Sequence, residues 1–324
     1  MTDVLYIPFA GSIEPWLSDF REAADGIVSM TVLDFERALD EQFEQVTVVV
    51  DQGGHGTRAM IDAGARAGVK LWQVLGTGLD HTDVDYIVSR GIPLAHTPGQ
   101  FSAIALAEHA LLFILCMAKH LREAEANARN GLMYHPVSDE LADKLLGIVG
   151  LGASGRELAV RARALGLRVH AVDVAPVPSE QLSELGVEHF DGIDGLDALL
   201  ARSDYVSLHV PLTAATRHLI DERRLALMKP TAALVNVARG AIVDEDALAR
   251  ALRERTIAGA GIDVFSQEPL PTDSPLLVLD NVVATPHTAG VTRGTSHRRS
   301  RACVENARRV LGGEEPLFQV SASA

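Results

Sequence analysis

Residues 145–173, LLGIVGLGASGRELAVRARALGLRVHAVD, constrain the fold more than any other stretch of this chain. An apolar run, LLGIV, leads into Gly150, Gly152 and Gly155, which fit the spacing G-x-G-x-x-G, and a helix-like segment follows. Here the first glycine permits a tight turn, the second lets the backbone approach a pyrophosphate, and the third lets the helix pack on the strand. The alternative is a β-α turn without a ligand.

An acid at the end of the next apolar run decides between these readings. Asp173 lies 18 residues after Gly155, where a carboxylate accepts hydrogen bonds from an adenosine ribose and repels a 2′-phosphate. The following residues, VAPVP, contain no Arg or Lys to neutralise such a phosphate. The strand, the helix and the acid together favour a dinucleotide site, with NAD as the cofactor in preference to NADP.

Short apolar runs separated by helix-like stretches recur along the chain. They read VLYI, GIVSM, VTVVV, LWQVL and IPLAH in the first hundred residues, and LLGIVGL, LRVHAVD, DYVSLHV, AALVNVA, GAGIDV and NVVATP later. This rhythm predicts an α/β protein with two doubly wound parallel sheets. Because 324 residues exceed one ordinary core, we expect two domains with a cleft between them.

Two helices are expected at the joins between these domains. From Phe101 to about Asn130 there is no proline, Ser102 can cap a long helix, and its middle, ALLFILCMA, is apolar on every face. Such a helix should be covered by protein all round, at a domain or subunit interface. The last 35 residues predict a basic helix that ends at GG and packs back on the first domain.

Composition excludes several classes of partner. With 29 Lys and Arg against 43 Asp and Glu, the net charge is −14, which disfavours nucleic acid and anionic membranes. The longest apolar run, Ala110 to Ala118, is shorter than the roughly 20 residues of a membrane span, so a cytoplasmic protein is expected. Cys116 and Cys303 are too few for a disulfide framework, and no cluster has the spacing of a metal site.

Three residues after later strand-like runs suit hydride transfer to and from an acid. His287, after NVVATP, can act as acid and base because imidazole titrates near neutrality. Glu268, in FSQEPLP, can bind the far ring nitrogen and orient the ring, while Arg239, after AALVNVA, offers a planar fork for a carboxylate. Each of these residues alone is weak evidence.

The chain resembles the D-isomer-specific 2-hydroxyacid dehydrogenases, and its phosphoglycerate dehydrogenase and glyoxylate/hydroxypyruvate reductase branches in particular. The resemblance rests on ordered motifs over nearly the whole chain: GTGLDHTDV, TPG, ALAEHAL, GIVGLGASG, SLHVPLTAATRHLI, LMKP, LVNVARGAIVDEDAL, GAGIDVFSQEP and VVATPHTAG. It assigns catalysis to Arg239, Glu268 and His287, the residues that the chemical argument chose. It also implies a D-2-hydroxy acid as substrate and a homodimer.

The resemblance further implies how the chain is divided and where ligands bind. A Rossmann domain at 101–288 would be inserted into a flavodoxin-like substrate domain formed by 1–100 and 289–324. Thr77 and Gly78, together with Arg239, would bind the substrate. The implied cofactor-binding residues are Gly150, Gly152, Ala153, Ser154, Gly155, Asp173, Pro211, Val237, Ala238 and Asp263. Ser154 departs from the family, which usually has an aliphatic residue there.

Other functions are open at this point. Some relatives in the family are NAD(H)-sensing corepressors, and within the enzyme class the competitors are NADP-linked glyoxylate or hydroxypyruvate reduction and formate or phosphite oxidation. Glu268 counts against formate oxidation, because formate enzymes of the family carry glutamine there. The sequence does not identify the substrate side chain.

Several further residues have both a functional and a structural reading. His55 and Arg58, in DQGGHGTR, either line a substrate cleft or face solvent in a turn. The arginines of RGTSHRRSRACVENARR either attract an anionic substrate, or form a solvated basic face or pair with acidic neighbours, and the second reading is favoured. His109 is expected to be a buried, hydrogen-bonded residue instead of a second base.

Overall fold

The computed structural model describes residues 3–9 and 14–320, and these fall into two compact units. Unit 1 takes its described residues from Met1–Phe101 and Thr292–Ala324, and unit 2 is Ser102–Val291. The inserted arrangement expected from the sequence has its boundaries within a few residues of these divisions. Each unit is described below by itself.

Unit 1 is built on a five-stranded parallel sheet with the order β2-β1-β3-β4-β5. This is the order of the flavodoxin-like doubly wound fold, in which the chain leaves the first strand in one direction and later continues in the other. The strands are β1 (Val4–Ile7), β2 (Met30–Val32), β3 (Val48–Gln52), β4 (Leu71–Leu75) and β5 (Leu94–Ala95). The β1, β3 and β4 strands are buried along their whole length, which explains their continuous apolar runs.

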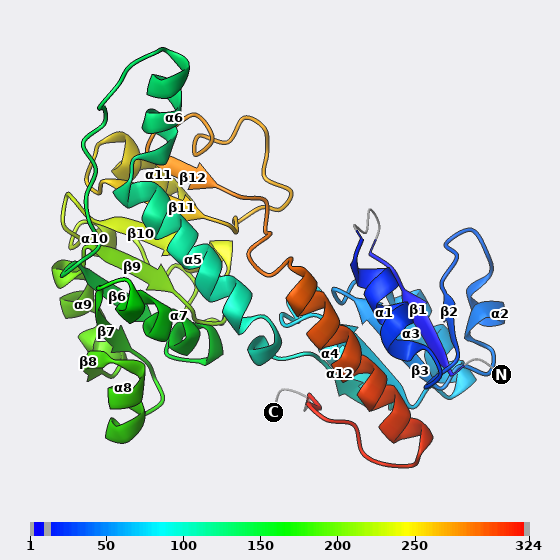
Figure 1. Ribbon diagram of the computed structural model, residues 1–324. Helices are drawn as coiled ribbons and strands as arrows, with labels where there is room; N and C mark the ends of the chain where they lie inside the picture. Colours follow the sequence, from blue (N-terminus) through cyan, green and yellow to red (C-terminus); the bar gives the residue numbers. More distant parts are fainter. Residues whose placement is uncertain (1–2, 10–13, 321–324) are drawn as a thin grey trace. The chain divides into compact units, whose positions relative to one another are not determined.

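Helices cover both faces of the unit 1 sheet (Figure 1). One core packs α1 (Trp16–Ala24) and α12 (Arg293–Leu311) against the sheet through Phe20, Cys303 and Val304. The other core lies under α2 (Leu39–Phe43), α3 (Arg58–Ala67) and α4 (Val84–Ser89). The basic C-terminal helix therefore returns to the first half of the chain, as predicted.

Unit 2 contains a seven-stranded parallel sheet with the order β12-β11-β10-β9-β6-β7-β8. Counted from β6 this is the Rossmann order with one further strand, and the chain reverses direction between β6 and β9. The strands are β6 (Leu145–Val149), β7 (Arg168–Val172), β8 (Val187–Asp191), β9 (Tyr205–Leu208), β10 (Ala233–Asn236), β11 (Gly259–Ile262) and β12 (Val282–Ala284). Both sheets confirm the α/β, doubly wound fold class.

The helices of unit 2 form two layers. α5 (Ala103–Ala118) and α7 (Ala153–Ala164) pack over one core, which also receives Leu146 and Ile148 of β6. α9 (Leu196–Arg202), α10 (Glu222–Leu225) and α11 (Glu245–Arg253) pack over the core on the other face. The remaining helices of unit 2 are α6 (Leu121–Arg129), α8 (Ser179–Leu185) and two short 3-10 turns at Ile193–Gly195 and Gly240–Ile242, while a third such turn, Gly99–Phe101, ends the first segment of unit 1.

Two strand predictions were wrong. The stretch GIVSM predicted a strand at 26–30, whereas β2 begins only at Met30 and continues to Val32. β8 was missed because its sequence, VEHFD, has only Val187 buried and contains two acids, so it lacks an apolar run. Both strands lie at the edge of a sheet, where one side of the strand has no neighbour and burial constrains the sequence least.

The single long helix predicted from Phe101 was also wrong. It is broken after α5, where His120 takes a left-handed backbone with φ 46°. The Asp139 N–H donates to the Ala118 carbonyl and Lys119 Nζ donates to the Asp139 carbonyl, so a distant loop ends α5. Ser102 stands at the N-cap position, but its side chain makes no capping hydrogen bond there.

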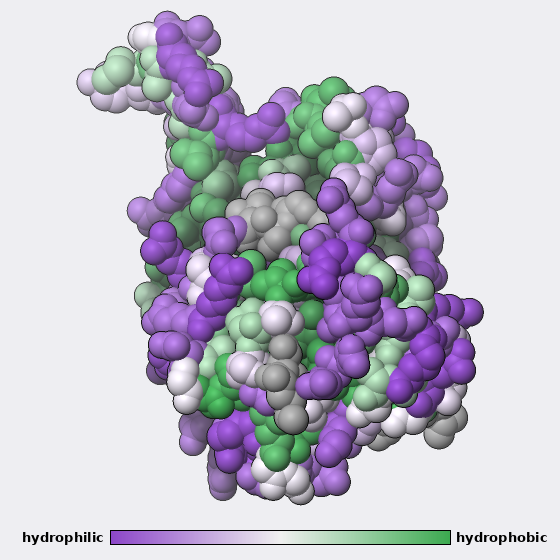
Figure 2. Space-filling view, turned by 90° about the vertical axis from the view of Figure 1, so that its right-hand side faces the viewer, coloured by the Kyte–Doolittle hydropathy of each residue, from purple (hydrophilic) through white to green (hydrophobic). Residues whose placement is uncertain are grey.

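The surface of α5 departs from the expectation of complete cover. Within the described chain Ile104, Leu112 and Leu115 are exposed, so the helix is not enclosed on every face. Of the helices described, none is by itself long and apolar enough to cross a membrane, and α5 with α6 meets that test only as a pair bent by 56°. On the face drawn in Figure 2, hydrophilic residues separate the hydrophobic areas, in line with the high charge of the chain.

Candidate active site

The glycine-rich turn between β6 and α7 has the geometry that its spacing predicts. Gly150 has φ +95°, and a Cβ there would lie 2.6 Å from the His209 carbonyl oxygen. A Cβ on Gly155 would lie 2.1 Å from the Gly150 carbonyl oxygen, so only glycine lets α7 begin this close to β6. At Gly152, by contrast, a Cβ would meet no protein atom within 4 Å. This open space would let a phosphate approach the backbone at Gly152.

Among the residues that the structure describes, no side chain caps the first turn of α7. Gly152 is the N-cap and supplies no side chain, whereas Thr57, Asp244 and Thr292 cap α3, α11 and α12 with their side chains. The first N–H groups of a helix have no intrahelical acceptor and carry the positive end of the helix dipole. The residues present therefore fit a pyrophosphate at this turn.

Asp173 lies at the end of β7 and touches the glycine-rich turn. Its Oδ2 accepts a hydrogen bond from the Leu151 N–H at 2.6 Å, and its Oδ1 accepts one from the Ala175 N–H at 2.9 Å. Each carboxylate oxygen can accept a second hydrogen bond. The acid is therefore fixed beside the turn and retains capacity for ribose hydroxyls.

Ser154 makes a side-chain contact that sequence reasoning did not anticipate. Its Oγ lies 2.9 Å from Nδ1 of His209, and Nε2 of the same ring lies 2.9 Å from Ser207 Oγ. Burial lowers the pKa of His209 to about 4, so the ring is neutral at physiological pH. Helix α7 is thereby joined to the end of β9.

The three predicted catalytic residues follow three neighbouring strands. Arg239 comes after β10, Glu268 after β11 and His287 after β12, and these strands are adjacent in the sheet. The carboxyl ends of parallel strands lie at one edge of a sheet, which is also the edge where the glycine-rich turn follows β6. Loops far apart in sequence therefore meet at this edge.

Glu268 and His287 form a hydrogen-bonded pair, as predicted. Glu268 Oε2 lies 2.7 Å from His287 Nδ1, and Glu268 Oε1 accepts the Phe265 N–H at 2.9 Å. Burial raises the pKa of Glu268, but these hydrogen bonds and the nearby Arg239 guanidinium bring that pKa below its usual value. An ionised carboxylate only accepts, so Nδ1 carries the proton and Nε2 is left for a substrate.

The loop that carries His287 is held by Asp263. This fully buried carboxylate accepts hydrogen bonds from Thr285 Oγ1 at 2.5 Å and from the N–H groups of Thr288 and Ala289. His287 itself has φ 54°, a left-handed backbone that a non-glycine residue adopts only when its surroundings impose it. The sequence predicted Asp263 as a cofactor contact, and its role as the anchor of this loop was missed.

Two further residues support the site: Gly240, which was not predicted, and His109, which was predicted to be hydrogen-bonded but without a named partner. Gly240 follows Arg239, and a Cβ on it would lie 1.9 Å from the Phe265 carbonyl carbon, so glycine lets the Glu268 loop approach the Arg239 turn. His109 Nε2 lies 2.9 Å from Thr285 Oγ1. Because Thr285 donates to Asp263, His109 donates to Thr285, which makes it a hydrogen-bonded structural residue.

The remaining predicted cofactor residues lie on neighbouring loops of the same sheet. Val237 and Ala238 are buried directly after β10, and the Ala238 N–H donates to Asn236 Oδ1. Pro211 is exposed after β9, and its carbonyl accepts a hydrogen bond from Thr216 Oγ1. Ala153 is exposed at the first position of α7.

In unit 1, the predicted substrate residues Thr77 and Gly78 follow β4 and are half-buried. Thr77 Oγ1 accepts a hydrogen bond from Arg299 at 2.7 Å. Arg299 also lines a cavity of about 220 Å³ at the carboxyl ends of β1, β3 and β4. The other residues of its lining are Phe9, Trp16, Gln52, Gly53, His55, Leu75 and Gly76.

His55 and Arg58 separate into the two readings given to them. The His55 ring lies 4.6 Å from the Phe9 ring centroid and 4.9 Å from that of His81, and it lines the cavity. Arg58 instead pairs with Asp83 at 2.8 Å, with 68% of its side chain exposed. The functional reading therefore suits His55, and the solvent-facing reading suits Arg58.

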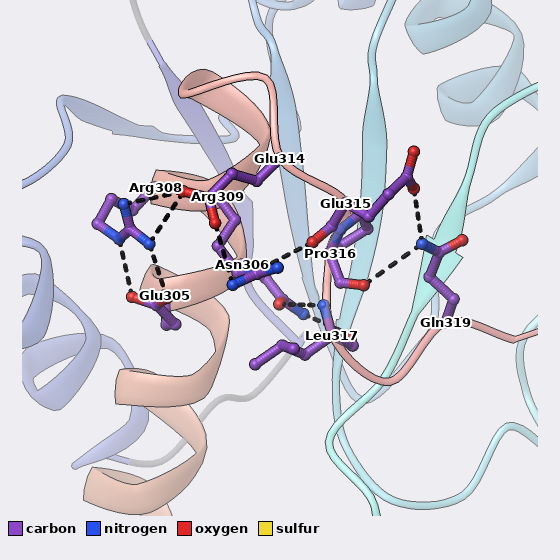
Figure 3. A network of polar contacts seen from close by, with 9 residues as sticks. All are labelled: Glu305, Asn306, Arg308, Arg309, Glu314, Glu315, Pro316, Leu317 and Gln319. Atoms are coloured by element: carbon purple, nitrogen blue, oxygen red, sulfur yellow. Dashed lines mark hydrogen bonds and ion pairs between the residues drawn. The ribbon is translucent and has the colours of Figure 1, made fainter.

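Among the arginines of residues 293–309, Arg308 and Arg309 pair with acids, the reading that the sequence favoured (Figure 3), whereas Arg298 donates to the Phe101 carbonyl. Arg308 binds Glu305 at 2.9 Å and Glu314 at 3.3 Å, and Arg309 binds Glu314 at 3.1 Å. These contacts join the helix to the chain that follows it. Arg299 differs, because it faces Thr77.

Neither cysteine has the setting of a reactive thiol. Cys116 and Cys303 are both free and buried, and burial raises the pKa of both thiols. Asp19, Glu22 and His297 form a cluster that their sequence spacing does not predict. One oxygen or nitrogen atom of each side chain lies within 4.8 Å of the other two. Asp19 and His297 lie at ion-pair distance, 3.8 Å, and we assign no metal to them.

Comparison with known sequences decides the family. The NAD binding domain of the D-isomer specific 2-hydroxyacid dehydrogenases matches residues 111–289, more than half of the chain and within unit 2. The chain belongs to this family. Unit 2 is therefore the nicotinamide dinucleotide-binding unit of a D-2-hydroxyacid dehydrogenase, an oxidoreductase.

Relatives of this dehydrogenase are similar over most of its length. A glyoxylate reductase of Korarchaeum cryptofilum is 42% identical over 246 residues, which are 74% of this chain and 72% of that protein. A D-3-phosphoglycerate dehydrogenase of Methanocaldococcus jannaschii is 36% identical over 286 residues, or 88% of this chain. The match spans only 53% of that longer relative.

A solved structure gives the same result for the fold. The D-lactate dehydrogenase of Aquifex aeolicus, determined with NAD and lactic acid, superposes with a TM-score of 0.82 at 29% identity. The match covers 99% of this chain and all of that one. Relatives are named for reactions of 2-hydroxy and 2-oxo acids, so the corepressor alternative is not favoured.

Proposed function

We propose that this protein is an NAD-dependent D-2-hydroxyacid dehydrogenase in which His287 is the acid and base, Glu268 orients it and Arg239 binds the substrate carboxylate. The observation that carries the proposal is the 2.7 Å hydrogen bond between Glu268 and His287, at the sheet edge that Arg239 and the glycine-rich turn share. We also propose that Thr77 and Gly78 of unit 1 bind the substrate carboxylate through their backbone.

The protein groups act on the proton and on the orientation of the substrate. The nicotinamide ring, when bound, accepts or supplies the hydride at C2 of the substrate. In oxidation, His287 Nε2 accepts the proton of the 2-hydroxyl, and Glu268 stabilises the imidazolium that results. In reduction, Nε2 returns this proton to the carbonyl oxygen. The Arg239 guanidinium holds the carboxylate in a fixed plane.

NAD is the proposed cofactor because the carboxylate of Asp173, which follows β7 and bonds the glycine-rich turn, would repel a 2′-phosphate on a bound adenosine ribose. No Arg or Lys follows within VAPVP, so an added phosphate would meet a negative charge without a counterion. The test measures absorbance loss with NADH and with NADPH for glyoxylate, hydroxypyruvate, pyruvate, phenylpyruvate and 2-oxoglutarate. Turnover of at least one acid with NADH supports the proposal, and Asp173→Ala should narrow the preference over NADPH. Faster wild-type turnover with NADPH would reject NAD as the cofactor.

We propose a homodimer formed through the exposed apolar side chains of α5. Ile104, Leu112 and Leu115 are exposed on a helix whose other residues are almost all apolar, and a second copy would remove them from water. Light scattering should give twice the chain mass of 34.7 kDa. Leu112→Glu should reduce it, whereas Val174→Glu, at another exposed apolar residue, should not. A monomeric wild type would refute the dimer. The cytoplasmic location also stays a prediction.

A further inference from the structure

Ser154, His209 and Ser207 form a chain of hydrogen bonds beneath the glycine-rich turn. His209 follows β9 and lies between the two hydroxyls, with Nδ1 2.9 Å from Ser154 Oγ and Nε2 2.9 Å from Ser207 Oγ. Ser207 belongs to β9, and Ser154 is the second residue of α7. These hydrogen bonds thus connect the buried strand β9 to the first turn of α7.

The two serines differ in their surroundings. Ser207 is completely buried, and within the part of the chain that the structure describes its hydroxyl has His209 as its hydrogen-bond partner. Ser154 is half-buried next to Gly152 and Ala153, which are exposed. A proton on the Ser207 oxygen therefore has one acceptor within reach among the described residues, whereas the Ser154 hydroxyl is only half-buried, so its proton is not confined to a protein acceptor.

This difference selects the tautomer of His209. If Nε2 carried the proton, it would donate to Ser207, and the Ser207 hydroxyl would be a buried donor without an acceptor, which is unfavourable. If Ser207 donates to Nε2, the ring proton lies on Nδ1 and is donated to Ser154 Oγ, so every buried donor is paired. The low pKa of His209 excludes the doubly protonated ring at neutral pH.

In the selected tautomer the Ser154 oxygen accepts from His209, and its own hydrogen is not used within the chain of three. We propose that the Ser154 hydroxyl is an additional donor to the cofactor pyrophosphate, oriented by His209 and Ser207. The proposal rests on the proposed function of unit 2 as the site of this dehydrogenase's NAD. The proposal explains why a serine stands at position 154, where the family usually has an aliphatic residue, because an aliphatic side chain has no hydrogen-bond donor.

The first experiment compares dissociation constants for NADH and ADP-ribose, both of which contain the pyrophosphate. Ser154→Ala should weaken binding of both about tenfold, since a donor to a charged oxygen is lost. Ser207→Ala should weaken both by less, because His209 is no longer held in one tautomer. The matched control is Ser203→Ala, since this buried serine donates to the Leu199 carbonyl and does not touch His209.

Equal affinity of Ser154→Ala and wild type for both ligands would overturn the proposal. If the wild type bound neither NADH nor ADP-ribose, the proposed function itself would fail. Thermal unfolding of each variant shows whether it is folded at the assay temperature.

A second measurement does not depend on the cofactor. Nitrogen-15 NMR of the histidine-labelled protein, with the His209 signals assigned by loss in His209→Asn, distinguishes the two tautomers directly. The expected result is a protonated Nδ1 in the wild type and a mixture of tautomers in Ser207→Ala. A protonated Nε2 in the wild type would overturn the inference even if Ser154→Ala weakened NADH binding.

Discussion

In unit 1 the loop that follows β3 is held by a buried acid, whereas in unit 2 the helix that follows the glycine-rich turn, α7, begins at Gly152 without a side-chain cap. Asp51 accepts hydrogen bonds from the His55 and Gly56 N–H groups and from Trp72 Nε1, all within 3.0 Å. At Gly152 no side chain caps the helix and a Cβ would meet nothing. At the carboxyl ends of their strands, the two sheets thus differ: unit 1 has a braced loop, and unit 2 has the uncapped helix that we propose as the pyrophosphate site.

The largest expected effect concerns His287, the proposed acid and base of unit 2. His287→Gln should lower kcat by about 10³-fold, because proton transfer by a positioned side chain contributes roughly 10²–10⁴-fold. Affinity for NADH should be unchanged, since the glycine-rich turn is intact. Steady-state kinetics and NADH fluorescence titration measure these two quantities. His189→Gln, an exposed histidine of β8, is the control, and normal kcat in His287→Gln would refute the assigned acid and base.

The braced loop of unit 1 predicts a loss of stability. Asp51→Ala leaves three buried or half-buried donors without their acceptor, which should lower the free energy of unfolding by about 3 kcal/mol. Asp51→Asn retains one oxygen acceptor and should cost less. Urea unfolding followed by Trp fluorescence measures both variants. If Asp51→Ala were as stable as wild type, the loop would not be held in the way described.

The third prediction concerns acid and the link between β9 and α7. The folded-state pKa of His209, about 4, lies below the unfolded value, so the unfolded state binds more protons between the two. The contribution of neutral His209 to the free energy of unfolding is present above about pH 6.5. It should fall by about 2 kcal/mol on going to pH 5. His209→Asn should show a correspondingly smaller fall across this range in urea titrations. Identical falls in both proteins would contradict the assignment of His209 as neutral in the folded protein.

The smallest expected effect tests whether the space beside Gly152 is used by the cofactor. Gly152→Ala adds a Cβ into space that no protein atom occupies, so thermal stability should stay close to that of wild type. The same Cβ would narrow the approach to the helix N–H groups, and affinity for NADH should fall about tenfold. Differential scanning fluorimetry and NADH titration separate the two. Unchanged affinity would show that this space is not used by the cofactor.

The sequence by itself determined the α/β class, the glycine-rich turn and the identity of Arg239, Glu268 and His287 as residues at strand ends. These features are local, because strand burial, glycine spacing and an acid after a strand are read within short windows. The same reasoning failed at β8 and at the break after α5. An edge strand buries too little to leave an apolar pattern, and the end of α5 at Ala118 depends on Asp139, which lies 21 residues further along the chain.

Only the tertiary structure decided how the site is supported. Asp263 holds the His287 loop, Gly240 admits the Glu268 loop, and Ser207 sets the proton of His209. The contacts of Asp263 and Gly240 join loops that are distant in sequence. The contact of Ser207 with His209 is local, but the proton position depends on the burial of Ser207, which a sequence window does not reveal. Residue identity shows which chemistry is available, but the pairing of buried donors and acceptors is fixed when distant segments pack together.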